Sequence, residues 1–133
     1  MRSKITALLI ALLLLTSGAE AQKAMARMGD MYFKQFDFKT ALKYYARAVK
    51  KDSNNVHVKQ NIADSYRHLN DWVNAETWYG KLANDQTADP LDKLYYAEAL
   101  RSNQKYAESK VAYKNYIAAV PSDATRLKAT CAS

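Results

Sequence analysis

The side chains best suited to metal binding or nucleophilic chemistry are two histidines and one cysteine. His57 and His68 stand eleven residues apart, which is about 16 Å along a helix and too far for both to ligate one ion. Cys131 is the third residue from the end, and a nucleophilic thiol needs a base held beside it. No phosphate-binding glycine loop, serine-hydrolase motif or zinc-protease motif occurs. We therefore expect no enzyme activity, no cofactor and no metal site.

Charged side chains recur at helical spacing instead. Asp64 and Arg67 lie three residues apart, as do Glu98 and Arg101. This spacing lets each pair form an ion pair on the surface of one helix. It also places both members of a pair on one face, where they can meet a ligand, and the sequence alone leaves both interpretations open.

The first residues predict an export signal. Met1 to Lys4 is short and basic, Ile5 to Leu15 is apolar apart from one threonine, and Ala19-Glu20-Ala21 has the pattern that signal peptidase cleaves. The apolar run covers roughly 16 Å as a helix, about half of the ~30 Å hydrocarbon core, and is too short for a transmembrane span. We expect residues 1–21 to be removed as a cleaved signal peptide.

The basic residues are unevenly distributed. Residues 22–55 hold eight basic and three acidic residues, a net charge of +5, whereas residues 56–89 have a net charge of −2. A basic end favours an acidic partner, anionic lipid or nucleic acid. No aromatic-basic motif accompanies these charges, and for an exported chain we expect no nucleic-acid partner.

Three segments of 34 residues, 22–55, 56–89 and 90–123, follow one another without insertion, and residues 124–133 form a short tail or partial capping helix. Because Gly and Pro are few, we expect two helices in each segment. Their ranges are 22–35 and 38–51 in the first, 56–69 and 72–85 in the second, and 90–103 and 106–119 in the third. The residue types that repeat are Gly29, Ala63 and Ala97; Tyr32, Tyr66 and Leu100; Phe38, Trp72 and Tyr106; Ala41, Ala75 and Ser109; and Tyr45, Tyr79 and Tyr113.

These residue types have physical reasons. The small residues let helix A and helix B of one segment approach closely, and we expect the aromatic residues at the repeated positions and at the turns to lie in the core. Residues 52–55 are a turn between segments, in which Asp52 or Ser53 can cap the next helix. Asp89-Pro90 is expected to open the third segment in the same way, with proline in the first helical turn.

The period and these residue types resemble the tetratricopeptide (TPR) family. The resemblance implies an all-α fold, a right-handed α-solenoid of three tandem helical hairpins whose function is protein–protein interaction. It also implies a concave groove lined by helix A of each repeat. Arg67 and Arg101 share one position in successive repeats, which predicts that they lie side by side and suits an acidic ligand. The partner-binding residues that the resemblance implies are Asp30, Phe33, Lys34, Asp64, Arg67, His68, Glu98 and Arg101.

Shorter segments are similar to the TPR region that opens some OmpA-family envelope proteins: Gln22 to Ala24, Gly29 to Phe33, and Tyr95 to Ser102. This similarity implies a periplasmic or outer-membrane-associated protein that associates with outer-membrane or secretion-machinery proteins. The function expected is a non-catalytic adaptor that binds a protein or peptide ligand. The alternative is a structural module that docks within a larger envelope protein or an oligomer.

Ala75→Trp tests the repeat register. It forces a large ring between helix A and helix B of the second segment, where the two backbones must approach closely. Overpacking of this kind typically costs about 1–3 kcal/mol, and more when the backbone must move. We expect the variant to unfold, as measured by thermal melting under circular dichroism, and a wild-type melting curve would show that the register is wrong.

Overall fold

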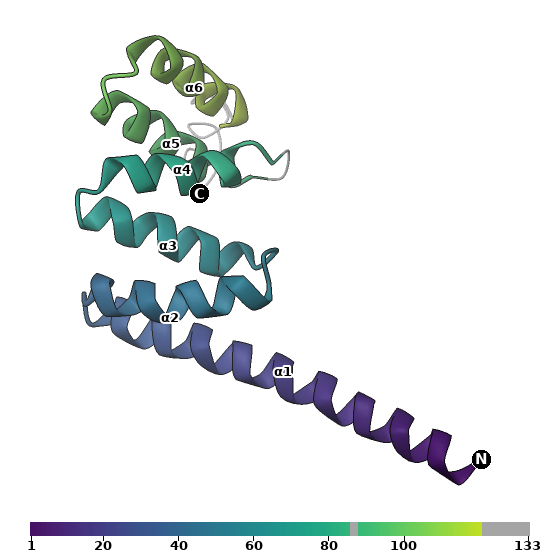
Figure 1. Cartoon of the computed structure of the whole chain (residues 1–133). Helices are drawn as coiled ribbons and strands as arrows, with labels where there is room; N and C mark the ends of the chain where they lie inside the picture. Colours follow the sequence, from purple (N-terminus) through teal and green to yellow (C-terminus); the bar gives the residue numbers. More distant parts are fainter. Residues whose placement is uncertain (86–87, 121–133) are drawn as a thin grey trace, which may run out of the picture. The chain divides into compact units, whose positions relative to one another are not determined.

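A computed structural model of the chain describes residues 1–85 and 88–120, with the backbone alone for residues 9–19. This part of the chain contains six α-helices and no strand (Figure 1). The all-α fold is therefore confirmed. The partial capping helix expected at 124–133 and Cys131 lie outside the described residues. The helices are α1 (Arg2–Lys34), α2 (Phe38–Lys51), α3 (Val56–His68), α4 (Trp72–Ala83), α5 (Pro90–Ser102) and α6 (Tyr106–Ala119).

The chain divides into two compact units, Met1–Ser65 and Tyr66–Ser133. In the first unit α1 packs along α2, and in the second α5 packs against both α4 and α6. The boundary falls inside α3, which is one continuous helix.

The first helix is longer than the sequence predicts. It begins at Arg2 rather than at residue 22, and its N-terminal part extends beyond the end of α2 (Figure 1). The apolar run is rich in Leu and Ala, which are strong helix formers, so it continues the helix of the first repeat. Removal of residues 1–21 stays a prediction. The other helices begin where they are expected and end within two residues of the predicted positions.

The turn from helix A to helix B has the same backbone in all three hairpins. Phe36, Asn70 and Gln104 have positive φ angles of 61°, 57° and 64°, and they lie 34 residues apart. The residue after each donates its N–H to a carbonyl five residues back, as Asp37 does to Tyr32 at 3.0 Å. This is the Schellman pattern of helix termination. The 34-residue period is therefore present in the backbone as well as in the sequence.

Side-chain caps open most of the following helices. The carboxylates of Asp37 and Asp71 accept from the backbone N–H three residues further on, at 3.1 and 3.2 Å. Asp89 accepts from the N–H two residues on at 2.9 Å, with Pro90 at the first position of α5. The cap predicted at Asp89 is confirmed, whereas Lys105 opens α6 without a side-chain cap bond.

The cap of α3 differs from the prediction. Asn55, rather than Asp52 or Ser53, accepts from the backbone N–H of Val58, at 3.1 Å. The Asp52 side chain instead accepts from the backbone N–H of Asn54 at 3.0 Å and stabilises the turn. Asn55 is the residue immediately before the helix, and only that residue can reach the N–H groups of the first turn.

The small repeated residues lie where two helices meet. Ala41, Ala63, Ala75 and Ala97 are fully buried, and Ser109 is buried as well. The Ser109 hydroxyl donates to the backbone carbonyl of Ala97 at 2.9 Å, which requires close approach of α5 and α6. The predicted role of these positions is therefore confirmed in this hairpin.

The aromatic residues range from buried to exposed, and Tyr32, Phe38, Tyr66, Trp72 and Tyr113 are partly buried. Tyr45 and Tyr79 are almost completely buried, as predicted. Phe36 is 78% exposed and Tyr106 is 67% exposed, so the expectation that both lie in the core was wrong. Phe36 occupies the turn itself, outside the helix faces that pack. Tyr106 opens α6, the second helix of the third hairpin, and Gln104 in the turn before it replaces the aromatic turn residue of the first hairpin.

Gly29 sets the packing of the first hairpin. A β-carbon at this residue would lie 2.4 Å from Cε1 of the Tyr45 ring, which is buried and cannot move away. We expect Gly29→Ala to lower the free energy of unfolding by about 1–3 kcal/mol despite the better helix propensity of alanine, as measured by urea denaturation. Gly80→Ala is the control, because its β-carbon would lie 3.1 Å from Tyr96. Gly80→Ala should lower the free energy of unfolding less than Gly29→Ala does, because the Tyr96 ring needs to shift by only a few tenths of an ångström. Equal losses in both variants would contradict the explanation.

Candidate functional site

An aspartate in α1 gathers polar side chains from the other helices of the first unit. Asp30 Oδ1 accepts from the Tyr45 hydroxyl at 2.7 Å and from Asn61 Nδ2 at 3.0 Å. His57 Nε2, one helical turn before Asn61, lies 3.0 Å from the same oxygen. Asn61 Nδ2 also lies 2.9 Å from the Tyr45 hydroxyl. These four residues, called the Asp30 cluster, connect α1, α2 and α3.

The Asp30 cluster has the chemistry of a recognition surface. Burial raises the pKa of Tyr45, and the hydrogen bond to the carboxylate of Asp30 raises it further, so the phenol remains a hydrogen-bond donor. For His57 Nε2 to bond the carboxylate oxygen, that nitrogen must carry a hydrogen. One aspartate oxygen thus meets three donors, while 62% of the His57 side chain stays exposed. The cluster fixes this imidazole in place and leaves it available to a partner.

The other residues predicted in the first unit lie on the same two A helices. Phe33 packs edge-on against Phe38, with ring centroids 5.3 Å apart, so part of its surface serves the hairpin core. Lys34 is exposed in the last turn of α1, and Asp64 is partly buried in α3. Of the predicted residues, Asp30 alone belongs to the cluster.

In the second unit, Arg67 is a packing residue as well as a surface residue. Its Nε donates to the hydroxyl of Tyr79 at 3.1 Å. Its guanidinium lies 4.3 Å from the centre of the Tyr95 ring, a distance at which a cation is attracted to the ring face. The two tyrosine rings are themselves 5.5 Å apart. Arg67 therefore joins the end of α3 to α4 and α5.

The remaining predicted residues lie on the surface of the second unit. His68 is exposed at the end of α3, Glu98 is partly exposed in α5, and Arg101 is exposed in the last turn of α5. Because Arg67 contacts two tyrosines, Arg101 is the more accessible of the two arginines. That they lie side by side and bind one ligand stays a prediction.

A second polar cluster joins α4 to the turn after α5. Lys105 Nζ donates to Glu76 Oε1 at 2.6 Å. Asn103 Nδ2 donates to Glu76 Oε2 at 2.7 Å and to the backbone carbonyl of Trp72 at 3.0 Å. Burial alone would raise the pKa of Glu76, but the hydrogen bonds from Lys105 and Asn103 hold it below its usual value. The same pairing raises the pKa of Lys105. This cluster stabilises the second unit.

No three His, Cys, Asp or Glu side chains of residues 1–85 and 88–120 are grouped so that they could hold a metal ion. Within the same part of the chain, no helix has both the length and the apolar character that a membrane crossing requires.

Residues 22–55 match the family model of the tetratricopeptide repeat. This segment runs from α1 through α2 to the turn before α3 and includes Asp30 and Tyr45. The match supports a TPR protein, and TPR repeats generally mediate protein–protein interactions and are typically non-catalytic. No curated protein is significantly similar to the chain.

The TPR resemblance predicted Asp30 as a partner-binding residue but predicted none of its contacts in the Asp30 cluster. Asp30, Asp64 and Glu98 share one position in the three repeats, and tyrosine recurs fifteen residues after each. The signal for a carboxylate–tyrosine bond was thus present in the sequence. His57 and Asn61 had no such signal, because their contacts with Asp30 span 27 and 31 residues.

The lowered pKa of Glu76 predicts how stability depends on pH. A carboxyl group whose pKa is lower in the folded state stabilises the fold above its unfolded pKa, and this contribution is lost as the pH falls through the folded value. We expect Glu76→Gln to lower the free energy of unfolding by about 1 kcal/mol at neutral pH, and the difference from wild type to disappear well below the ordinary pKa of 4.5.

The measurement is urea denaturation at neutral pH and at low pH. Glu108→Gln is the matched control, because Glu108 is an exposed carboxylate in the first turn of α6. It should change stability less than Glu76→Gln does at neutral pH. A Glu76→Gln difference that is the same at both pH values would contradict the role given to the ionised carboxylate.

Proposed function

We propose that the chain is a protein-interaction adaptor that binds a peptide or protein segment on the exposed face of its A helices. In the first unit this face includes the Asp30 cluster and Lys34, and in the second it includes Glu98 and Arg101. The observation that carries the proposal is the Asp30 cluster, which fixes the exposed His57 imidazole between α1 and α3. The TPR match over residues 22–55 supports the same class of function.

The chemistry of this face suits a polar segment with charges of both signs. Lys34 offers hydrogen-bond donors, and Glu98 offers an acceptor. His57 Nε2 already donates to Asp30, so its Nδ1 is the ring nitrogen left for a ligand. Side chains whose positions are fixed before binding lose little conformational freedom when a ligand arrives, which favours affinity. Arg101, exposed in α5, can bond both oxygens of a carboxylate.

We place this adaptor outside the cytoplasm, in the periplasm or at the outer membrane. The support is the signal-like segment of residues 1–21. Association with outer-membrane or secretion-machinery proteins is part of the proposal and rests on the resemblance to the TPR region of OmpA-family proteins. The comparison with curated proteins adds no support for that resemblance.

The alternative proposal is a structural module that docks within a larger envelope protein or an oligomer. Exposed apolar side chains on α6 favour it, since Val111 is 59% exposed and Ile117 is 68% exposed. Analytical ultracentrifugation separates the two proposals. Docking between copies predicts a dimer that depends on concentration, and an adaptor predicts a monomer until a partner is added.

Neutralising two exposed cations on the A helices tests the adaptor. We expect Lys34→Gln/Arg101→Gln to remain folded by circular dichroism and to reduce the capture of envelope proteins about tenfold or more, because charge-assisted bonds to the ligand are lost. Capture is measured by quantitative mass spectrometry of proteins retained from a native envelope fraction. Intact mass of the exported chain also shows whether residues 1–21 are removed.

Lys110→Gln/Lys114→Gln is the matched control, since it removes two exposed cations from α6. It should retain the partners that the wild type retains. If the Lys34/Arg101 variant keeps the same partners at the same salt concentration, the A-helix face is not the binding surface and the structural-module proposal takes its place.

A further inference from the structure

Helix α2 carries the densest positive charge of the described chain. Its fourteen residues include five cations and no acidic residue. Lys39, Lys43, Arg47 and Lys51 follow one another every four residues, so they form a stripe about 18 Å long on one side of the helix. Lys50 lies three residues after Arg47, and all five side chains are exposed. We call these five residues and the adjoining pocket the α2 cationic face.

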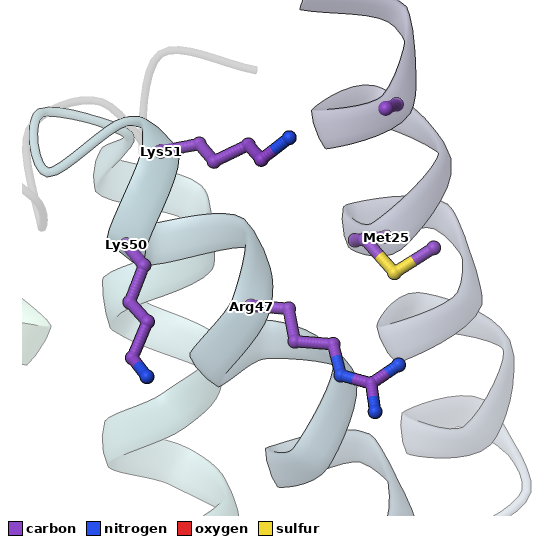
Figure 2. Close-up of a pocket in the computed structure, with 5 residues that line it drawn as sticks. Met25, Arg47, Lys50 and Lys51 are labelled. Carbon is purple, nitrogen blue, oxygen red and sulfur yellow. The ribbon is translucent and has the colours of Figure 1, made fainter. Parts of the chain in front are cut away.

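The adjoining pocket lies between α1 and α2, at the C-terminal end of the stripe. Its volume is about 390 Å³, and it is lined by Ala21 and Met25 from α1 and by Arg47, Lys50 and Lys51 from α2. Figure 2 shows Met25 facing the gap, with Arg47 and Lys51 reaching towards α1 on either side of it. An apolar wall beside several cations suits an apolar group that has acidic neighbours.

The α2 cationic face is a different surface from the A-helix face. Its cations come from helix B of the first repeat, whereas Lys34 and His57 belong to helices A. Removal of residues 1–21 would take Ala21 from the pocket wall, but Met25 and all five cations would remain. Its occupant is therefore a question separate from the adaptor function.

The spacing of the cations points to a helical partner. Carboxylates at every fourth position of a helix have the same spacing of about 6 Å as the cations of α2, so two helices lying side by side can pair charge for charge. A membrane surface fits less well, because helices that bind membranes carry large apolar side chains beside their cations. On α2 the exposed residue next to Arg47 is Ala46, which is apolar but small.

We propose that the α2 cationic face binds an acidic amphipathic helix of a partner protein. Carboxylates at every fourth position of this helix pair with Lys39, Lys43, Arg47 and Lys51. One apolar side chain of the helix enters the pocket beside Met25. The site is a second interaction surface, which lets the chain hold one protein on its A helices and another on α2.

Synthetic helical peptides test the proposal with the whole 133-residue chain. The probe is a fluorescein-labelled peptide with Glu at every fourth position along one face and Leu beside them. The control peptide has the same composition, but its Glu residues are spread around the helix. Fluorescence anisotropy should show tighter binding of the first peptide, and Arg47→Gln/Lys51→Gln should weaken that binding about tenfold or more.

Three variants separate the contributions. Lys110→Gln/Lys114→Gln removes two cations at the same spacing from α6 and should change the dissociation constant less than twofold, by about the effect of net charge alone. Met25→Trp fills the pocket without changing charge and should weaken binding. Lys34→Gln/Arg101→Gln should leave peptide binding intact, so failure of the adaptor function is distinguishable from failure of this site.

Several results would overturn the proposal. One is equal affinity for the two peptides, or an Arg47→Gln/Lys51→Gln variant that binds as the wild type does. Another is binding to phosphatidylglycerol vesicles or to heparin that matches peptide binding and shows the same dependence on Arg47 and Lys51. Either outcome would make α2 a general polyanion-binding helix rather than a site for an acidic partner helix.

Discussion

Close approach of two helices within each hairpin is the constraint on which the rest of this structure depends. A single hairpin of this size cannot bury enough apolar surface by itself, so it gains stability by packing its helices closely and stacking on a neighbour. In the first hairpin, Gly29 leaves room for the ring of Tyr45, which is then completely buried. A buried phenol needs a hydrogen-bond partner, because an unpaired buried hydroxyl costs about 1–3 kcal/mol. Asp30 supplies that partner from the next residue of α1.

The same constraint explains why the candidate surface is polar and ordered. Asp30 reaches the Tyr45 hydroxyl at the edge of the core, and its carboxylate remains near enough to solvent to accept from α3 as well. His57 and Asn61 donate to it, so a bond required by core packing also positions side chains on the open face. In the second unit Arg67 combines the two roles, since it bonds a buried tyrosine and lies over a second ring.

The sequence predicts the parts of this protein that repeat. The helices after the first, the small residues between them and the buried tyrosines follow from the 34-residue period, because each depends on contacts within one hairpin or with the helix that follows it. The start of α1 does not follow from it, since the preceding apolar segment is itself a good helix former. The contacts of His57 with Asp30 and of Lys105 with Glu76 join successive repeats through residue types that the period does not share. Phe36 shows a further limit, since an aromatic residue at the turn fits the pattern and yet remains exposed.

The charge of α2 is the one feature that neither repetition nor packing requires. Like charges four residues apart destabilise a helix by about 0.2–0.5 kcal/mol for each pair, and the stripe from Lys39 to Lys51 contains three such pairs. The packing of the buried face of α2, with Ala41, Tyr45 and Ala48, does not depend on which residues lie on its exposed side. Lys50 and Lys51 gain from the negative end of the helix dipole, but Lys39 lies in the first turn, at the positive end, where the dipole disfavours a cation. The attraction of Lys39 and Lys43 to the Asp37 carboxylate offsets part of this cost. Stability alone would thus place acidic residues in the first half of α2. The anionic partner helix proposed above accounts for their absence.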